Sequence, residues 1–282
     1  MLEFKRLLQV EWIKLWNNGI ARFLIISYFT LISSVALLTT VKFDFGAFKF
    51  HLAEEGIFNF PFIWHFNSYL VAYLKLFFAV VIVALVGNEY SYRTLKQNLI
   101  DGLSKIEFLG SKVLMIATFV LISTLFLGVV SLLLGLLYSD YTEFSILIMD
   151  IDYLLAYAVK LFGFFSFCLF LSVLIKRSAF ALGLLFFWQF IEGIIWIWAW
   201  SNLREHPWLS PEKFMQFFPL QAMSNTIDEP FTRLSAVRNI ANQIGQEMSV
   251  HPGVQYHELF IALVWSVIFL WGSYQILLKR DL

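Results

Sequence analysis

Long apolar runs alternate with short polar segments along the chain, and this alternation predicts six membrane-spanning helices. The runs lie at about residues 22–41, 66–87, 113–138, 153–175, 179–200 and 258–278. An α-helix needs about 20 mainly apolar residues to cross a hydrocarbon core about 30 Å thick, and each run is long enough. The predicted fold class is therefore all-α: a polytopic membrane protein that forms a single transmembrane domain over residues 1–282.

Residues 1–20 predict an amphipathic helix that lies along the membrane surface before the first span. Apolar side chains recur on one face at helical spacing, and polar side chains fall mainly off that face. The apolar face consists of Phe4, Leu7, Leu8, Trp12, Leu15 and Trp16. Trp12 and Trp16, together with several cationic side chains, suit the membrane–water interface. The segment is either a simple anchor or a connecting helix that also touches a cytoplasmic partner.

Composition agrees with a chain surrounded by lipid. The sequence is 60% hydrophobic and 14% charged, whereas soluble domains are about half apolar and a quarter charged. The formal net charge is zero, so no overall field favours binding to nucleic acid. The single cysteine, Cys168, cannot form a disulfide within the chain and fits no metal-binding motif.

The distribution of Lys and Arg predicts that both termini are cytoplasmic. Six spans place the two termini on the same side of the membrane. With that side inside, 12 of the 20 Lys and Arg residues lie on inner segments, six on outer segments and two within spans. Cytoplasmic loops carry an excess of these residues in membrane proteins.

Residues 88–112 form an unusually polar interval between the second and third spans, on the predicted cytoplasmic side. The stretch from Glu89 to Ile100 is rich in good helix formers. Asp101 and Gly102 follow it, and Gly readily takes the left-handed conformation that ends many helices. The first part of the interval is thus predicted to be a helix that stops at a sharp corner.

A second helix is predicted to begin directly after this corner and to continue into the third span. Ser104 and Glu107 form an S-x-x-E capping box, in which each side chain bonds a free backbone amide near the other. Leu103 and Phe108 occupy the positions of a hydrophobic staple. The alternative is an ordinary helical hairpin that is capped for stability and has no partner.

The same interval resembles the coupling segment of ABC-2-type transporter permeases. A Glu at the end of the second span precedes x-x-x-R-T, a short helix and then L-S-K-x-E-F-x-x-S-K. The residues that carry the resemblance are Glu89, Arg93, Thr94, Leu103, Ser104, Lys105, Glu107 and Lys112. Many members have Gly-Thr in place of Arg93-Thr94, and many have Pro in place of Leu103. The surface helix, six spans and long outer loop resemble the family over the whole chain.

The resemblance implies a permease subunit of an ATP-driven transporter, more often an exporter than an importer. In that family a coupling helix between the second and third spans seats in the ATP-binding subunit. The contact residues implied here are Glu89, Arg93, Thr94, Lys96, Gln97, Asp101, Ser104 and Glu107. The implied assembly has two permeases, as a homodimer or a heterodimer, and two ATP-binding subunits in a bacterial-type cytoplasmic (inner) membrane.

The chain is not expected to be an enzyme. It lacks the G-x-x-x-x-G-K-[ST] loop that cradles nucleotide phosphates, so ATP and Mg²⁺ would be held by the partner subunit. It also lacks H-E-x-x-H and G-x-S-x-G, and the spacing of its five histidines matches no zinc signature. We therefore expect no catalytic residue, no cofactor and no metal site in this chain.

Residues 201–257 predict an extracytoplasmic helical loop before the last span. Ser210 is a candidate N-cap followed by Pro211 at the first helical position, and this helix is expected to end near Pro219. A second amphipathic helix is expected after Pro230. The position resembles the re-entrant helices of ABC-2-type permeases, and the alternative is a surface lid without transport contacts.

Three charged residues fall within predicted spans: Lys75, Lys160 and Glu192. A charge at the centre of a span costs about 2.5–3.5 kcal/mol, so such residues usually face the protein interior or form pairs. Lys160 lies near enough to an outer end for its amine to reach the interface, whereas Lys75 does not. Glu192 is a candidate partner for Lys75, within the chain or across a dimer.

Small residues recur at three- and four-residue steps along the third span and predict close helix packing, with a dimer seam as the alternative. They are Thr124, Gly128, Ser131 and Gly135. Two other function classes stay open. In an ATP-independent secondary carrier or channel, Lys75 and Glu192 would gate or couple ions, although no internal repeat is evident. A structural membrane subunit would recruit partners through residues 88–112.

Overall fold

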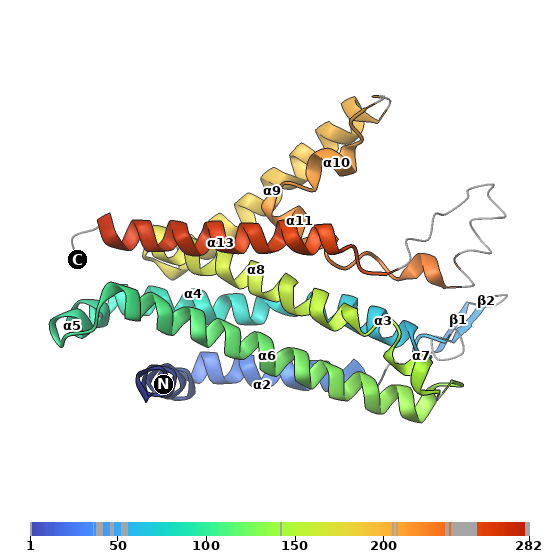
Figure 1. Ribbon diagram of the computed structural model, residues 1–282, viewed down its shortest axis with the longest axis horizontal. Coiled ribbons are helices and arrows are strands. Elements are labelled where there is room, and N and C mark those ends of the chain that lie inside the picture. Colours follow the sequence, from blue (N-terminus) through green and yellow to red (C-terminus); the bar gives the residue numbers. More distant parts are fainter. Residues whose placement is uncertain are drawn as a thin grey trace.

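The computed structural model describes residues 2–35, 37, 42–45, 48–51, 56–141, 143–204, 206, 208–234, 237 and 253–279. Most helices run side by side in one bundle, and α9 leaves it at an angle (Figure 1). The helical elements are α1 (Leu2–Asn17), α2 (Gly19–Ser34), α3 (Phe62–Ala72), α4 (Lys75–Ser91), α5 (Thr94–Ile100), α6 (Lys105–Tyr138), α7 (Phe144–Ile148), α8 (Asp152–Ile175), α9 (Ser178–Leu203), α10 (Pro211–Met215), α11 (Pro219–Asn225), the 3₁₀ turn η2 (Phe231–Arg233) and α13 (Tyr256–Lys279). Strands β1 (Lys42–Phe45) and β2 (Phe48–His51) form a small antiparallel hairpin.

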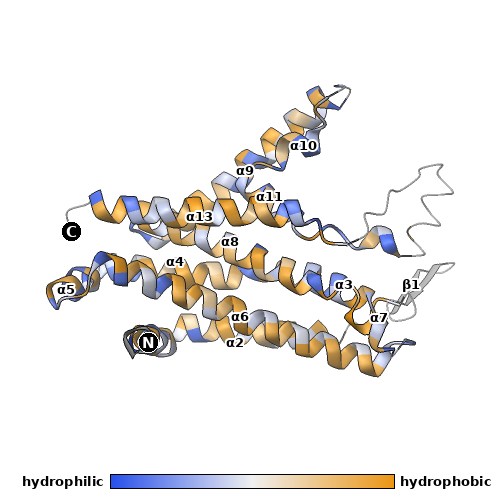
Figure 2. Cartoon of the chain, viewed as in Figure 1, coloured by the Kyte–Doolittle hydropathy of each residue, from blue (hydrophilic) through white to orange (hydrophobic). Residues whose placement is uncertain are grey.

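The described helices are those of a membrane-embedded protein. Four of them, α6, α8, α9 and α13, are long and apolar enough to cross a membrane, and α3 with α4 makes a fifth if the bent pair is one span. Within the first expected span, 22–41, the structure describes the apolar helix α2, which ends at Ser34, and residues 36 and 38–41 of that span lie outside the described residues. Apolar residues cover the middle of the bundle, and polar ones gather at its ends (Figure 2).

The second expected span is broken between α3 and α4, which are bent by 42°. Around the break, Tyr73 N bonds Leu70 O, Leu74 N bonds Val71 O and Phe77 N bonds Leu74 O. Each bond reaches back three residues, so the chain tightens locally into a 3₁₀ turn. Lys75 is the first residue of α4 after this turn.

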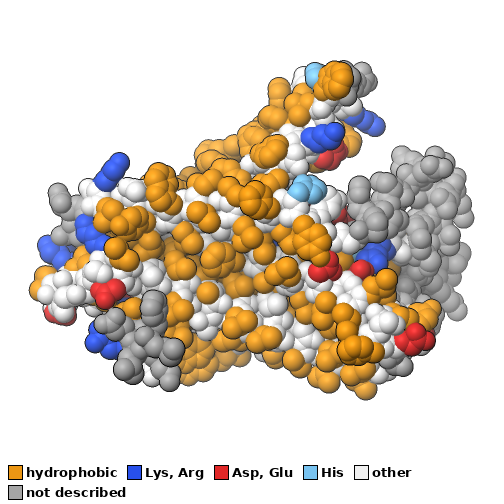
Figure 3. All heavy atoms as spheres, viewed as in Figure 1, with side chains coloured by type: hydrophobic (Ala, Val, Ile, Leu, Met, Phe, Trp, Pro, Cys, Tyr) orange, Lys and Arg blue, Asp and Glu red, His pale blue; other side chains and the backbone are white. Residues whose placement is uncertain are grey.

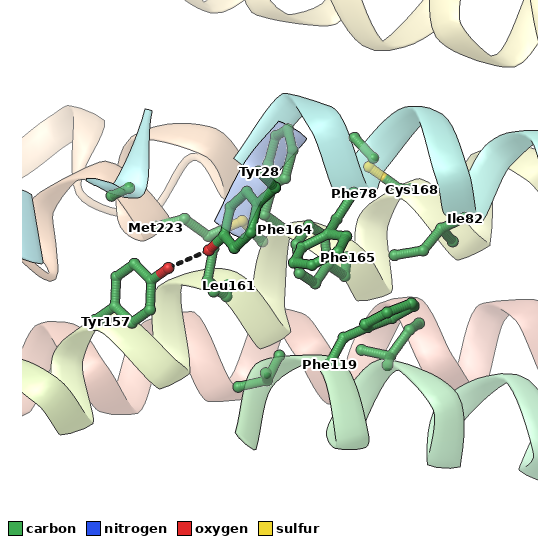
Figure 4. Packing of buried hydrophobic residues seen from close by; sticks show 14 of the residues in the cluster. Tyr28, Phe78, Ile82, Phe119, Tyr157, Leu161, Phe164, Phe165, Cys168 and Met223 are labelled. Carbon is green, nitrogen blue, oxygen red and sulfur yellow. Dashed lines mark hydrogen bonds between the residues drawn. The ribbon is translucent and has the colours of Figure 1, made fainter. Parts of the chain in front are cut away.

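The core is built around α8, which packs against α3, α4, α6, α9 and α13. Phe78 of α4 contacts Phe119 of α6, with ring centroids 4.6 Å apart. The hydroxyl groups of Tyr28, Ser123 and Tyr157 hydrogen-bond to one another in the same region (Figure 4). Helix association in lipid depends on close packing and on such interhelical hydrogen bonds, because lipid tails are as apolar as the side chains.

The small residues of α6 pack against neighbouring segments, as expected. A Cβ atom at Gly135 would overlap the ring of Phe60, and one at Gly128 would lie 3.3 Å from a side chain of α8. Ser131 accepts a hydrogen bond of 2.9 Å from the Asn67 amide. These positions therefore serve packing within the chain.

The two ends of the chain lie at the same end of the bundle as α5, which we call the α5 end (Figure 1). There α1 is seen end-on, so it runs across the direction of the bundle helices, as expected of a helix in the membrane plane. Lys and Arg side chains stand at the α5 end of the visible face, and hydrophobic side chains cover its middle (Figure 3).

The face of α1 that packs on the bundle differs from the expected one. Glu11 and Leu15 are buried, whereas Trp12 and Trp16 remain about two-fifths exposed. The two Trp rings stack on each other, with centroids 5.7 Å apart. The two Trp side chains are therefore free to lie against lipid headgroups. Glu11 is buried because the cationic side chains of Lys14 and Lys112 lie next to its carboxylate.

The loop 201–257 contains the expected first helix in shortened form. The Ser210 hydroxyl caps α10 by accepting from Lys213 N, and α10 ends at Met215. A new helix, α11, begins at Pro219. Only the turn η2 follows Pro230, and most of the second expected helix lies outside the described residues.

Candidate functional site

The polar interval between α4 and α6 folds as a helix, a corner and a second helix. Arg93 takes the left-handed conformation, with φ of 57°, and redirects the chain from α4 into α5. Gly102, with φ of 98°, ends α5. Leu103 N bonds Asn98 O at 2.9 Å, and this backward bond satisfies a carbonyl at the helix end. The expected stop at Asp101-Gly102 is confirmed, but the expected helix from Glu89 to Ile100 is broken at Arg93, so that Glu89 belongs to α4 and α5 begins at Thr94.

The start of α6 is fixed by the predicted capping box. Glu107 N donates to the Ser104 hydroxyl at 3.1 Å, and Ser104 N donates to the Glu107 carboxylate at 2.7 Å. Phe108 is buried, and Leu103 packs against the core beside it. The backbone groups at the end of α5 and at the start of α6 thus have specific hydrogen-bond partners, and these bonds hold α5 in a defined position at the tip of the bundle.

Most of the expected contact residues lie on the exposed surface of this corner. The exposed ones are Arg93, Thr94, Lys96, Gln97, Asp101 and Ser104. Leu95 is buried and anchors α5 on the bundle. Glu107 is half-buried because its carboxylate serves the capping box. Glu89 is buried with 5% of its surface exposed, so it cannot belong to the outer surface of the segment.

Glu89 belongs instead to a buried ionic cluster with Glu11, Lys14 and Lys112. The Lys112 ammonium lies 2.6 Å from a carboxylate oxygen of Glu11 and 2.6 Å from one of Glu89. The Lys14 ammonium lies 3.1 Å from Glu11 and 2.7 Å from the same Glu89 oxygen. Two anions and two cations balance, as burial requires. The cluster ties together α1, α4 and α6 directly behind α5.

The neighbouring charges outweigh burial in this cluster. Burial by itself raises the pKa of Glu11, but Lys112 and Lys14 hold that pKa below its ordinary value of 4.5. Burial likewise lowers the pKa of Lys14, but Glu11 and Glu89 hold it above its ordinary value of 10.5. Both groups are therefore charged throughout the neutral range.

Glu11 is the site residue that the sequence interpretation missed. Residues four apart on a helix are neighbours on one face, so Glu11 stands between Leu7 and Leu15. A carboxylate inside an otherwise apolar stripe was the available signal. Its partners could not be identified, because Glu89 and Lys112 lie far away in sequence.

A basic pocket opens beside α5. It has a volume of about 720 Å³, and four cationic residues line it: Arg93, Lys96, Lys176 and Arg177. Lys176, with φ of 63°, ends α8, and its ammonium lies 5.7 Å from the centre of the Tyr90 ring. The short connection between α8 and α9 therefore lies next to the α4–α6 corner, and the cationic side chains of the two segments form one surface.

The start of α9 touches α4 directly behind this surface. A Cβ atom at Gly87 would lie only 2.8 Å from the backbone nitrogen of Ser178. Only glycine allows such a close approach of two backbones. From this contact α9 diverges from the bundle (Figure 1).

Glu192 and Lys160 hold the two ends of α11. The Glu192 carboxylate accepts from Leu220 N at 3.1 Å, Gln221 N at 2.9 Å and the Trp188 indole at 2.6 Å. Lys160 donates to Ser224 O, in the last turn of α11, at 3.0 Å. An anion at the N-terminus and a cation at the C-terminus match the helix dipole.

The candidate pair between Glu192 and Lys75 is not formed within this chain, where both residues are described and no ion pair joins them. The acceptor oxygens of Glu192 are engaged by N–H groups that α11 could not satisfy internally. Lys160 also differs from the prediction that its amine reaches the membrane interface, because the ammonium instead donates to Ser224 O at the end of α11. The Lys75 ammonium lies 4.5 Å from the centre of the Phe164 ring.

A second polar group lies at the opposite end of the bundle. His65 donates from Nε2 to Asp228 O at 2.8 Å, and its Nδ1 accepts from Arg233 at 3.2 Å. Arg233 also pairs with Asp150 at 3.0 Å. His65, Asp228 and Arg233 border a cavity of about 640 Å³. Within the described part of the chain, no three His, Cys, Asp or Glu residues are placed to hold a metal ion.

Comparison with known protein families, with curated proteins and with solved structures gives no match. The functional argument therefore rests on the residues and on their geometry.

Proposed function

We propose that this chain is the permease subunit of an ATP-driven transporter, an exporter of the ABC-2 type, coupled to separate ATP-binding subunits through residues 88–112. One observation carries the proposal: α5 is a short, exposed, polar helix fixed at a rigid corner, and a buried ionic cluster lies directly behind it. A segment that only connected two spans would need neither the six exposed polar residues nor this reinforcement.

The contacts behind α5 suggest how force would pass from it to the spans. Leu95 seats α5 on the bundle, and Glu89 with Lys112 locks α4 to α6. At Gly87, α4 bears on the first residue of α9. A push on α5 would therefore tilt α4, α6 and α9 together, and alternating access would follow from that tilt.

The charge of the contact surface suggests the chemistry of the partner. Four cationic side chains line the basic pocket, and two of them, Lys176 and Arg177, come from the α8–α9 connection. Complementary charge sets the register and speed of association between proteins. The partner face is proposed to carry carboxylates opposite Arg93 and Lys96, which assigns to the α8–α9 connection a part in coupling.

The proposed assembly has two permease chains, identical or not, and two ATP-binding subunits that hold ATP and Mg²⁺. The α5 end and both termini face the cytoplasm of a bacterial-type cell, following the distribution of Lys and Arg. In this assembly α2 and the α3–α4 pair complete the six spans of each permease.

The break between α3 and α4 favours a second candidate, an ATP-independent carrier or channel. Discontinuous helices with charged residues at the break form the binding sites of many secondary transporters, and Lys75 stands at such a break. Transport in ion-loaded vesicles without ATP would support this candidate.

Capture of an ATP-binding subunit tests the proposal. The tagged chain is purified together with candidate ATP-binding subunits from the same genome, in wild-type form and as the double variant Arg93→Glu/Lys96→Glu. We expect the wild type to retain the ATPase and the variant to lose affinity about tenfold or more, since two attractive contacts become repulsive. Lys213→Glu reverses one charge in the same sense on α10, far from α5, and should bind normally. Equal retention by the double variant would contradict the proposed contact.

A further inference from the structure

A cavity of about 410 Å³ lies where the α3–α4 break faces α9. Lys75 lines it near the middle of the α3–α4 pair, which runs from Phe62 to Ser91. Broken helices at mid-membrane depth are recurrent binding positions, because the break leaves room for a ligand beside polar groups. The position of this cavity is therefore that of a ligand site within the membrane rather than at either surface.

The Lys75 ammonium in this cavity has no anionic partner among the described residues. Its neighbour is the ring of Phe164, labelled in Figure 4, at 4.5 Å. None of the ion pairs of the described residues includes Lys75. A cation in a span usually pairs or marks a pathway, because its burial is costly. The aromatic ring offsets only part of that cost.

The acidic residue in the same cavity is already engaged. Glu192 accepts three hydrogen bonds, from the indole of Trp188 and from two amides at the start of α11. The Lys75 ammonium is therefore the charged group of this cavity that is left to bind a ligand, and that ligand would be an anion.

Part of the rim of the cavity consists of exposed apolar and aromatic side chains. Tyr73 and Leu76 line it and are 62% and 38% exposed. Trp196 and Gly193 line the α9 side. A free inorganic anion would gain nothing from this rim, whereas an amphiphile would place its charged group on the ammonium and its chain along the rim.

We propose that the cavity between the α3–α4 break and α9 binds an anionic amphiphile, with its headgroup on Lys75 and its apolar chain between Tyr73 and Trp196. Identification of this ligand as the transported cargo rests on the proposed function. The binding itself requires no ATP-binding subunit and is measured on this chain alone.

Lipid retention tests the site. The full chain is placed in nanodiscs of phosphatidylcholine with a minor share of phosphatidylglycerol, released, and analysed by native mass spectrometry. We expect the wild type to retain phosphatidylglycerol well above its share in the disc. Lys75→Met should reduce that preference about tenfold, and Lys75→Arg should keep it. Lys279→Met removes an equal charge from an exposed position at the end of α13 and should leave the preference unchanged.

Three results would overturn the proposal. They are equal retention by the wild type and Lys75→Met, an equal loss in Lys279→Met, and full displacement of the lipid by inorganic phosphate, which would indicate a site for the free anion alone. Loss of ATPase capture, by contrast, would count against the proposed function and not against this site.

A second variant guards against a folding defect in Lys75→Met. Gly193→Phe fills the cavity from α9, and a Cβ atom at Gly193 meets nothing within 4 Å, so the helix itself is not strained. We expect this variant to lose phosphatidylglycerol with an unchanged melting temperature. Retention of the lipid by a folded Gly193→Phe protein would contradict the proposed location.

Discussion

At the scale of single residues, four charged side chains at the α5 end are paired with one another. Glu11 and Glu89 meet Lys14 and Lys112 at the α5 end. Removing one member of a buried pair leaves the other without compensation and costs about 3–5 kcal/mol. The cluster is therefore the place where a single substitution should most disturb the relation between α1 and the bundle.

The Glu11→Gln variant should lower the free energy of unfolding at neutral pH by about 3–5 kcal/mol, because it leaves Lys14 and Lys112 with one carboxylate. The wild type should also depend on pH. The folded pKa of Glu11 is depressed, so its contribution is present above pH 4.5 and is lost as pH falls through the lower folded value. The folded pKa of Lys14 is raised, so its contribution is present below pH 10.5 and is lost as pH rises through the higher value.

Thermal unfolding in detergent micelles at a series of pH values measures both effects. The melting temperature of Glu11→Gln should fall less steeply toward acidic pH than that of the wild type, because the variant has no Glu11 carboxylate to protonate. Trp12→Phe changes a neighbouring, exposed position of α1 and should follow the wild-type curve. Identical melting temperatures and pH curves for wild type and Glu11→Gln would contradict the role given to the cluster.

Residues whose partners are near in sequence were predicted correctly, and those with distant partners were not. The capping box of Ser104 and Glu107 and the left-handed Gly102 follow from local chemistry. Glu192 was a candidate partner for Lys75, but it caps a helix that starts 27 residues later, at Pro219. No pattern in a single sequence indicates which distant backbone amides a carboxylate will meet.

At the scale of elements, hydrophobic length predicted the long helices well and the broken ones poorly. The expected spans 113–138, 153–175, 179–200 and 258–278 correspond to α6, α8, α9 and α13. The break between α3 and α4 has no proline or glycine, the usual cause of a kink. It is a local 3₁₀ turn, and uniform apolar sequence conceals it.

The contact between α4 and α9 gives a prediction at this scale. Gly87→Ala places a methyl group 2.8 Å from the Ser178 nitrogen and must push the helices apart. We expect a loss of about 1–3 kcal/mol in the free energy of unfolding, as for other overpacked cores. The measurement is the shift in melting temperature.

Gly183→Ala is the matched control on α9, since a Cβ atom there meets nothing within 4 Å. Alanine is favoured over glycine inside a helix by about 0.5–1 kcal/mol, so this variant should be as stable as the wild type or slightly more so. Equal stability of the Gly87→Ala and Gly183→Ala proteins would show that the close contact is not needed.

At the scale of the whole molecule, the two ends of the bundle have different characters. The α5 end carries a fixed corner, a basic pocket and an ionic cluster. Away from the α5 end, the short helix α11 is held at both ends by charged side chains, and a polar cavity lies beside it. We interpret the first as the place where force enters and the spans between as the part that moves.

Site-directed cross-linking tests this account most directly. Gln97→Cys places a thiol on the exposed face of α5, and the native Cys168 is buried and should not react. With a maleimide cross-linker, we predict a covalent product between Gln97→Cys and the ATP-binding subunit, and none from Lys213→Cys on α10. Absence of a product at Gln97, or equal products at both positions, would contradict the claim that α5 receives an ATP-binding subunit.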